Sequence, residues 1–186
     1  MQIMHRRIVR LATAGLLAIM LCPARAIAQD ECKPPPHVRP EKELRLLVDE
    51  AARRSPAVRA LIERLEGLDV TVYIRLRLFD QFDLEGRVGL LAGATSHRYL
   101  IIELARRRTA DSQMATLAHE LFHATEIAAD PSVVDVRSLA ALYGRIGIQT
   151  DYHAGRLTFE TQGAVAAGRQ TRRELWASPS RSTDGS

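Results

Sequence analysis

The chain has 186 residues, of which 46% are hydrophobic, 26% are charged and only 5% are aromatic. This length suits one packed domain, and the composition excludes intrinsic disorder and the collagen-like and disulfide-scaffold classes. The formal charge of +4 is concentrated at the amino terminus, because residues 1–28 contain four of the 26 lysines and arginines and none of the 22 acidic residues. The rest of the chain is neutral, which gives no electrostatic reason to expect nucleic acid or an anionic membrane surface as a partner.

Residues 1–28 have the organisation of a targeting signal. A cationic start, MQIMHRRIVR, precedes the run LATAGLLAIMLC, which is too short to span a bilayer, and AIA at residues 26–28 supplies the small residues that a signal peptidase reads. We expect cleavage before Gln29 and a mature chain that is exported, periplasmic or secreted, with no stable membrane anchor. The alternative, an uncleaved anchor, is disfavoured by Pro23 and Arg25 directly after the apolar run.

Cleavage would leave Cys32 as the single cysteine, so no internal disulfide is expected. A dimer bridged through Cys32 stays open, and the oligomeric state does not follow from the sequence. Residues 29–40 contain three consecutive prolines, which predict an extended leader without a functional role. We therefore expect one domain over residues 41–177, followed by a disordered tail over residues 178–186.

Hydrophobic periodicity predicts a small α+β domain with amino-terminal helices and a short, mainly antiparallel sheet. Two amphipathic packing helices are expected after the leader, the second capped by Ser55. The alternation over residues 70–78 predicts a half-buried strand, and residues 86–92 and 98–104 predict two more. The run YLIIEL in the last of these is apolar on both faces, which indicates a strand covered on both sides.

The segment TADSQMATLAHELFHATEIAADP predicts the next helix. It is expected to be capped near Thr109 or Asp111 and to stop before Pro131. One stripe of this helix is formed by Met114, Leu117, Ala118, Leu121, Thr125 and Ala128. The stripe indicates the side that packs on the core.

Three polar residues of this helix cluster on the side opposite the stripe. At about 100° per residue, His119, His123 and Glu126 share that side, and Glu120 projects beside them. Residues four apart are neighbours on a helix surface, so the two imidazoles can both reach one divalent metal ion. The spacing predicts a metal site on this helix.

His119, Glu120 and His123 form the pattern His-Glu-x-x-His, and here the chain resembles the zincin metallopeptidases. It is also similar to exported bacterial sequences regarded as metallopeptidases, a resemblance that names no substrate. The resemblance implies Zn²⁺ held by His119 and His123, with Glu120 as the general base for hydrolysis of a peptide bond. The implied partner is a peptide or protein substrate.

A catalytic zinc ion takes three protein ligands. The chain lacks the third-histidine continuation of the metzincins and is gluzincin-like, a subgroup in which a glutamate on a later helix supplies the third ligand. In FETQGAVAAGRQTRREL, Glu160 and Ala164 fit that pattern, and small residues on the same face would let this helix approach the motif helix closely. Glu160 is thus the expected third ligand, and Glu126 is expected to orient a histidine. Glu126, Asp130 and Asp135 remain alternatives for the third ligand.

Zincins generally add a tyrosine or histidine that steadies the oxyanion. Tyr143, Tyr152 and His153 lie between the motif and the expected third ligand, and we favour His153 and Tyr152. In gluzincin-like folds a strand beside the motif helix pairs with the substrate backbone, for which residues 98–104 or 86–92 are the local candidates.

Two other classes of protein remain open. In the first, the domain binds zinc without catalysis and serves as an envelope interaction or scaffold domain. In the second, the histidines bind no metal and the chain is a periplasmic binding module. Metal analysis and a peptide-cleavage assay separate the three classes.

Export can be tested on the amino terminus of the mature protein. We expect a chain that begins at or near Gln29, because the small residues before it form the expected cleavage site. Intact-mass measurement of exported material provides the check, and retention of Met1 would contradict cleavage.

Overall fold

The computed structural model describes residues 36–81, 83–153 and 156–178, which belong to a compact unit spanning Pro35–Ser186. The expected signal peptide, Cys32 and all of the tail beyond Ser178 lie outside the described residues. Among the described residues, no helix combines the length and apolar composition that a bilayer crossing requires.

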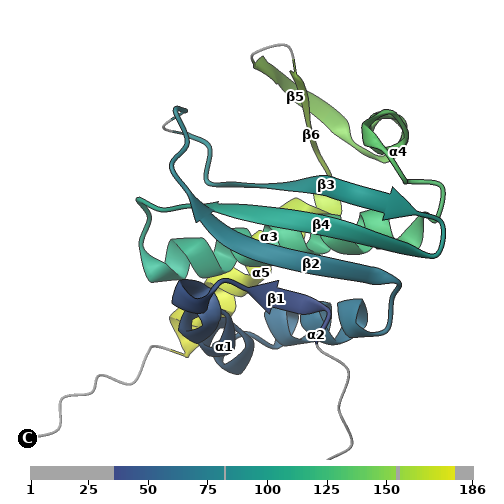
Figure 1. Cartoon of the computed structure of the whole chain (residues 1–186). Helices are drawn as coiled ribbons and strands as arrows, with labels where there is room; N and C mark the ends of the chain where they lie inside the picture. The colour runs from purple at the N-terminus through teal and green to yellow at the C-terminus, as the bar shows by residue number, and fades with distance from the viewer. Residues whose placement is uncertain (1–35, 82, 154–155, 179–186) are drawn as a thin grey trace, which may run out of the picture. The chain divides into compact units, whose positions relative to one another are not determined.

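The described residues form an α+β domain, as the sequence predicted. Four helices lie on one face of a sheet, and α4 lies with the strands β5 and β6 beyond the edge strand β3 (Figure 1). In chain order the elements are β1 (Val38–Pro40), a 3₁₀ turn (Lys42–Leu44), α1 (Arg45–Arg54), α2 (Pro56–Glu66), β2 (Val70–Arg77), β3 (Gly86–Ala94), β4 (His97–Ala105), α3 (Ala110–Ala129), α4 (Val136–Ile146), β5 (Ile148–His153), β6 (Arg156–Glu160) and α5 (Gln162–Ala177).

The main sheet has the strand order β1-β2-β4-β3, and β5 and β6 form a separate antiparallel pair. β2 pairs in parallel with both β1 and β4, whereas β3 pairs antiparallel with β4. The sheet is therefore mixed, and the expectation of a mainly antiparallel sheet was wrong. The physical reason is the connection between β1 and β2, because α1 and α2 carry the chain back along the sheet before the next strand starts.

β1 comes from the segment expected to be a leader. Val38 is buried in the core, and the backbone N–H of Glu41 donates to the carbonyl of Ile74 at 2.8 Å. Pro40 is tolerated because it lies on an edge strand, where a missing donor costs little. The domain thus begins before residue 41, although the extended backbone of this segment agrees with its proline content.

The expected helix caps are present. Ser55 accepts a hydrogen bond from the backbone N–H of Val58 at the start of α2, and Thr109 accepts one from Ser112 at the start of α3. α3 ends at Ala129, before Pro131. Local side-chain chemistry therefore determines where both helices begin.

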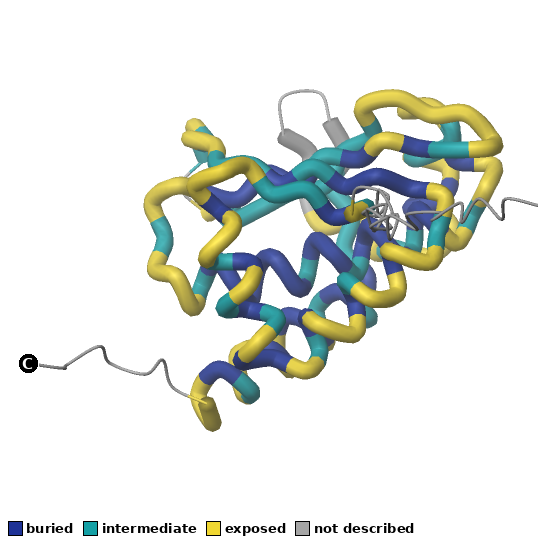
Figure 2. Tube along the Cα trace, turned by 60° about the horizontal axis from the view of Figure 1, so that its bottom comes forward, coloured by how far each residue is buried: buried dark blue, intermediate teal, exposed yellow. Residues whose placement is uncertain are grey.

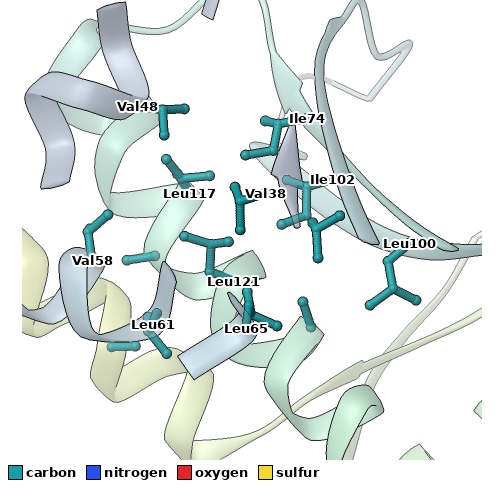
Figure 3. Close-up of a cluster of buried hydrophobic side chains, with 14 of the residues drawn as sticks. Val38, Val48, Val58, Leu61, Leu65, Ile74, Leu100, Ile102, Leu117 and Leu121 are labelled. Atoms are coloured by element: carbon teal, nitrogen blue, oxygen red, sulfur yellow. The ribbon is translucent and has the colours of Figure 1, made fainter. Parts of the chain in front are cut away.

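The core lies between the helices and one face of the main sheet. Figure 3 shows Ile74 and Ile102 of the sheet facing Leu117 and Leu121 of α3, with Val38 among them. Figure 2 shows the buried segments gathered between the sheet and the helices, with exposed residues on the outer turns. Each fully buried side chain of this size stabilises the fold by about 1.5–3 kcal/mol.

Two polar side chains attach α3 to β4. The Arg98 guanidinium donates to the carbonyls of Ile127, Ala128 and Asp130 at 2.8–3.3 Å, which satisfies the free carbonyls at the helix end. The amide of Gln113 donates to the carbonyl of Ala105 at 2.9 Å near the helix start. α3 is therefore fixed to the sheet at both ends.

Among the described residues no helix covers the second face of β4 (Figure 1), so the expectation of a strand covered on both sides was wrong. Tyr99 on that face is 41% exposed, yet Glu103 is only 2% exposed. Arg75, Arg77 and Arg87 of the neighbouring strands cover Glu103, with nitrogen-to-oxygen distances of 2.6 Å for Arg75 and 3.4 Å for Arg77. Burial alone would raise the pKa of Glu103, but the hydrogen bonds and charges of Arg75 and Arg87 outweigh it and hold the pKa below its ordinary value.

We expect Glu103→Gln to lower the free energy of unfolding by about 1–3 kcal/mol at neutral pH, because charge-assisted bonds are lost. A lowered folded-state pKa stabilises the fold above the ordinary glutamate value of 4.5, and this contribution disappears as the pH falls through the folded-state value. Urea unfolding at about pH 7 and about pH 3 should therefore show a difference between the two proteins that shrinks in acid.

Glu63→Gln, at an exposed position on α2, is the matched control. An equal loss of stability in both variants, or a difference that does not depend on pH, would contradict the role of Glu103.

Candidate metal centre

α3 carries the motif residues in its middle turns, inside the domain. Glu120 is 5% exposed and His123 is 4% exposed, so the helix face opposite the apolar stripe is buried as well. The helix packs against β3 and β4 and also against α5. The pattern of the sequence correctly placed the imidazoles on one side, but that side faces other parts of the protein.

Glu160 comes to the motif from β6. It is the last residue of that strand, and Thr161 caps α5 by accepting from the backbone N–H of Ala164 at 3.2 Å. The expectation that Glu160 belongs to the helix was wrong, because Thr161 is a strong capping residue and the strand continues up to it. The residue nevertheless lies beside the motif.

The structure brings His119, His123 and Glu160 together. One ligand atom from each lies within 4.8 Å of the other two, and His119 Nε2 lies 3.2 Å from Glu160 Oε2. Ligand atoms around a tetrahedral zinc ion, at about 2.0–2.2 Å from it, are separated by roughly 3.4 Å. The widest separation would need to shrink by only about 1.4 Å to hold such an ion, so these donors fit a divalent metal.

Close contact between α5 and α3 sets the position of this cluster. A Cβ atom at Gly168 would lie 3.4 Å from the carbonyl oxygen of Ala115 and 3.5 Å from Cβ of His119. Ala164, Ala167 and Thr171 on the same side of α5 are buried. The small side chains thus let the two helices approach, as their spacing predicted.

Glu126 and Tyr143 hold His123 in place. The Nδ1 of His123 lies 2.8 Å from the Glu126 carboxylate, so the ring donates there and its Nε2 lone pair is left for the cluster. The Tyr143 hydroxyl donates to the His123 carbonyl at 3.4 Å, and the two rings meet edge to face at 5.4 Å. Glu126 therefore orients the ring of His123, as the sequence led us to expect.

The remaining sequence candidates lie elsewhere. Asp130 accepts from Ser132 at 2.6 Å and pairs with Arg145 at 2.7 Å, and Asp135 caps α4. The side chains of Tyr152 and His153 lie outside the part of the chain that the structure describes. Neither aspartate joins the cluster of the described residues.

Glu120 lies beneath β3. The backbone of β3 lies against its carboxylate: a Cβ atom at Gly86 would lie 3.1 Å from its Oε1, and the backbone amide of Val88 favours the charged form. Burial raises the pKa of Glu120, with a smaller contribution from the charge of Glu160, while His119 and His123 oppose the rise. Glu120 is thus a desolvated carboxylate packed against β3 next to the cluster.

The site as a whole favours positive charge. Burial lowers the pKa of His119, but the hydrogen bond that its ring donates to Glu160 and the charges of nearby carboxylates outweigh it and raise the pKa. Burial raises the pKa of Glu160, but the contact with His119 lowers it overall. Burial, followed by the same carboxylates, raises the pKa of the Tyr143 phenol. A protonated imidazole is stabilised here by the same field that would stabilise a metal cation.

Sequence reasoning missed the roles of Tyr143, Val88 and Gly86. Tyr143 belongs to α4, which was not predicted, and the Val88 N–H becomes relevant only once β3 lies over α3. Gly86 offered one usable signal, since glycine in a strand often marks a close approach. A substitution there would meet the Cγ2 of Thr116 at 2.5 Å as well as Glu120.

Comparisons of the chain with protein-family models, curated proteins and solved structures find no match. The chemistry and geometry of this site are therefore what indicate a function.

The ligand set can be ranked by metal titration, with Zn²⁺ as the probe ion. We expect about one bound ion per chain, and its loss in His119→Ala and His123→Ala. Glu160→Ala should weaken zinc binding sharply because it removes a ligand. Glu126→Ala should lower the zinc affinity by only about ten- to a hundredfold, because it leaves His123 in place and removes only the group that orients its ring.

Calorimetric titration of chelator-stripped protein gives both affinities. If Glu126→Ala removes the metal and Glu160→Ala retains it, the third ligand lies on α3 and the assignment of Glu160 is wrong. Asp135→Ala is not suitable as a control because that residue caps a helix, so Glu63→Ala serves instead.

Proposed function

We propose that the chain is an exported zinc-dependent peptidase of the zincin type, with Glu120 as the general base. The observation that carries the proposal is the gathering of His119, His123 and Glu160 within 4.8 Å, beside the buried carboxylate of Glu120. The motif on α3 resembles that of the zincins, and Glu160 supplies the third donor that the gluzincin resemblance leads us to expect.

The donor set supports zinc as the metal. Two imidazoles and one carboxylate form a common catalytic zinc sphere that keeps one position for water. Bound there, the ion would polarise a substrate carbonyl and lower the pKa of the water. The histidines and Glu160 would hold the ion, with Glu126 fixing the ring of His123.

Glu120 is suited to move a proton. Its carboxylate is buried against Gly86 of β3, so it would meet the substrate in a restricted orientation. It accepts a proton as water attacks the peptide carbonyl and then donates that proton to the leaving amine. Each turnover returns Glu120 to the carboxylate form, and the products are a free carboxylate and a free amine.

The substrate backbone would bind along β3. β4 is paired on both sides, by β2 and β3, whereas β3 is the last strand of its sheet. Extended peptides bind by adding a strand to a free sheet edge. Since Gly86 and Val88 of β3 contact Glu120, a peptide at this edge would bring its carbonyl close to the base. Of the two strands considered from sequence, β3 is therefore the one we propose.

We expect Glu120→Gln to retain zinc while reducing hydrolysis by about 10²- to 10⁴-fold, because the amide keeps the shape of the side chain and cannot accept the proton. Cleavage of a peptide library, with and without chelator, measures activity, and elemental analysis of protein purified without a histidine tag measures zinc. Glu126→Gln is the comparison variant, and it should reduce hydrolysis less than Glu120→Gln does because Glu126 does not act as the base.

The outcomes separate the three classes of protein. Zinc without hydrolysis by the wild type would favour the inactive interaction or scaffold domain. Absence of zinc would favour a binding module that uses no metal. Hydrolysis that survives Glu120→Gln would overturn the role of Glu120.

A further inference from the structure

A groove of about 620 Å³ lies beside the candidate metal centre. Glu160 belongs both to the metal cluster and to the lining of this groove. β5 contributes Ile148 and Thr150 to the lining, and α5 contributes Val165 in its second turn. A substrate that occupies the centre can therefore continue into the groove.

Two arginines give the groove a positive charge. Arg169 and Arg173, one turn apart on α5, both line it and both are exposed. Arg172 on the same helix instead reaches Glu85 at 3.4 Å. Among the described residues, Arg169 has no hydrogen-bond or ion-pair partner, and Glu160 is the only acidic residue of the lining.

Glu160 would not cancel this charge in the zinc-loaded protein, because its carboxylate is the proposed third ligand and would face the metal cation together with His119. The two guanidiniums therefore offer donors to a ligand that enters the groove. Guanidinium groups bind carboxylates through two parallel hydrogen bonds, which are stronger than bonds between neutral groups. The chemistry selects an acidic side chain or a terminal carboxylate.

The position of Arg169 along α5 gives the expected distance between the metal cluster and the carboxylate that the arginines would bind. Arg169 lies eight residues beyond Thr161, which corresponds to about 12 Å along the helix axis. Helical side chains lean toward the helix start, so a guanidinium at this position can reach to within roughly 6–12 Å of Glu160. An extended peptide advances about 3.3 Å per residue, which places the bound carboxylate about two to four residues from the cleaved bond.

We propose that this groove is a specificity subsite that selects peptide substrates with an acidic residue about two to four positions from the cleaved bond. Arg169 and Arg173 are the specificity-determining residues. The inference rests on the proposed peptidase function, and it adds the substrate class: peptides from acidic segments rather than from neutral or basic ones.

The test uses zinc-loaded mature protein and blocked alanine- and leucine-based peptides of about ten residues. The peptides form pairs in which one position carries Glu or Gln, and that position is moved along the peptide. Cleavage gives kcat/KM for each pair, and fluorescence anisotropy with the Glu120→Gln variant gives binding without cleavage. The variants are Arg169→Gln, Arg173→Gln and Arg64→Gln, the last an exposed arginine on α2 that changes net charge equally.

We expect the Glu peptide to be bound and cleaved about five- to tenfold better than the Gln peptide at positions within the stated range. Arg169→Gln and Arg173→Gln should each reduce that ratio toward one, and Arg64→Gln should preserve it. Equal use of both peptides, binding of neither, or the same loss in Arg64→Gln overturns the subsite. Acid-selective binding without cleavage retains the subsite and contradicts the peptidase, whereas cleavage without selectivity does the reverse.

Discussion

The enclosure of α3 is the constraint on which the rest of the structure depends. The helix lies between the main sheet and α5, so nearly every turn contacts protein on more than one side. Polar groups in such a position need partners, since an unpaired buried polar group costs about 1–3 kcal/mol. The ring of His123 contacts the Glu126 carboxylate and Glu120 packs against Gly86 of β3, which makes the site residues part of the packing. The candidate centre is consequently preorganised, because its side chains are held by the same contacts that hold the fold.

Features set by local chemistry could be predicted from the sequence. The caps at Ser55 and Thr109, the position of the helix that carries the motif, and the sharing of one side by His119 and His123 all follow from spacing within a few residues. Features set by distant contacts could not. The parallel pairing of β2 and the location of Glu160 at a strand end depend on how the chain returns across the sheet, which periodicity does not encode.

Glu103 shows why hydrophobic pattern alone failed for β4. The run around it is apolar enough to indicate two covered faces, but the second face is covered locally by arginine side chains from the neighbouring strands. Arg75 and Arg87 belong to different strands and meet at Glu103 only because of the register of the sheet. Their aliphatic stems and charges substitute for a second helix layer at this point. The apolar residues of a strand thus indicate that it is buried. Which groups cover each face depends on tertiary contacts that the strand's own sequence does not contain.

The two sides of α5 serve two different requirements of the proposed activity: one side packs against α3 and sets the metal cluster, and the other carries the arginines that select the substrate. Its inner side needs small residues such as Gly168 and Ala164, because a methyl group at Gly168 would already contact α3, and a longer side chain would push that helix away and move His119 relative to Glu160. Its outer side carries Arg169 and Arg173, which are exposed and line the groove rather than the contact with α3. Substitutions on the outer side can therefore change which peptides are selected while the metal geometry stays fixed. The inner side cannot vary in the same way, since packing and coordination there depend on the same few atoms.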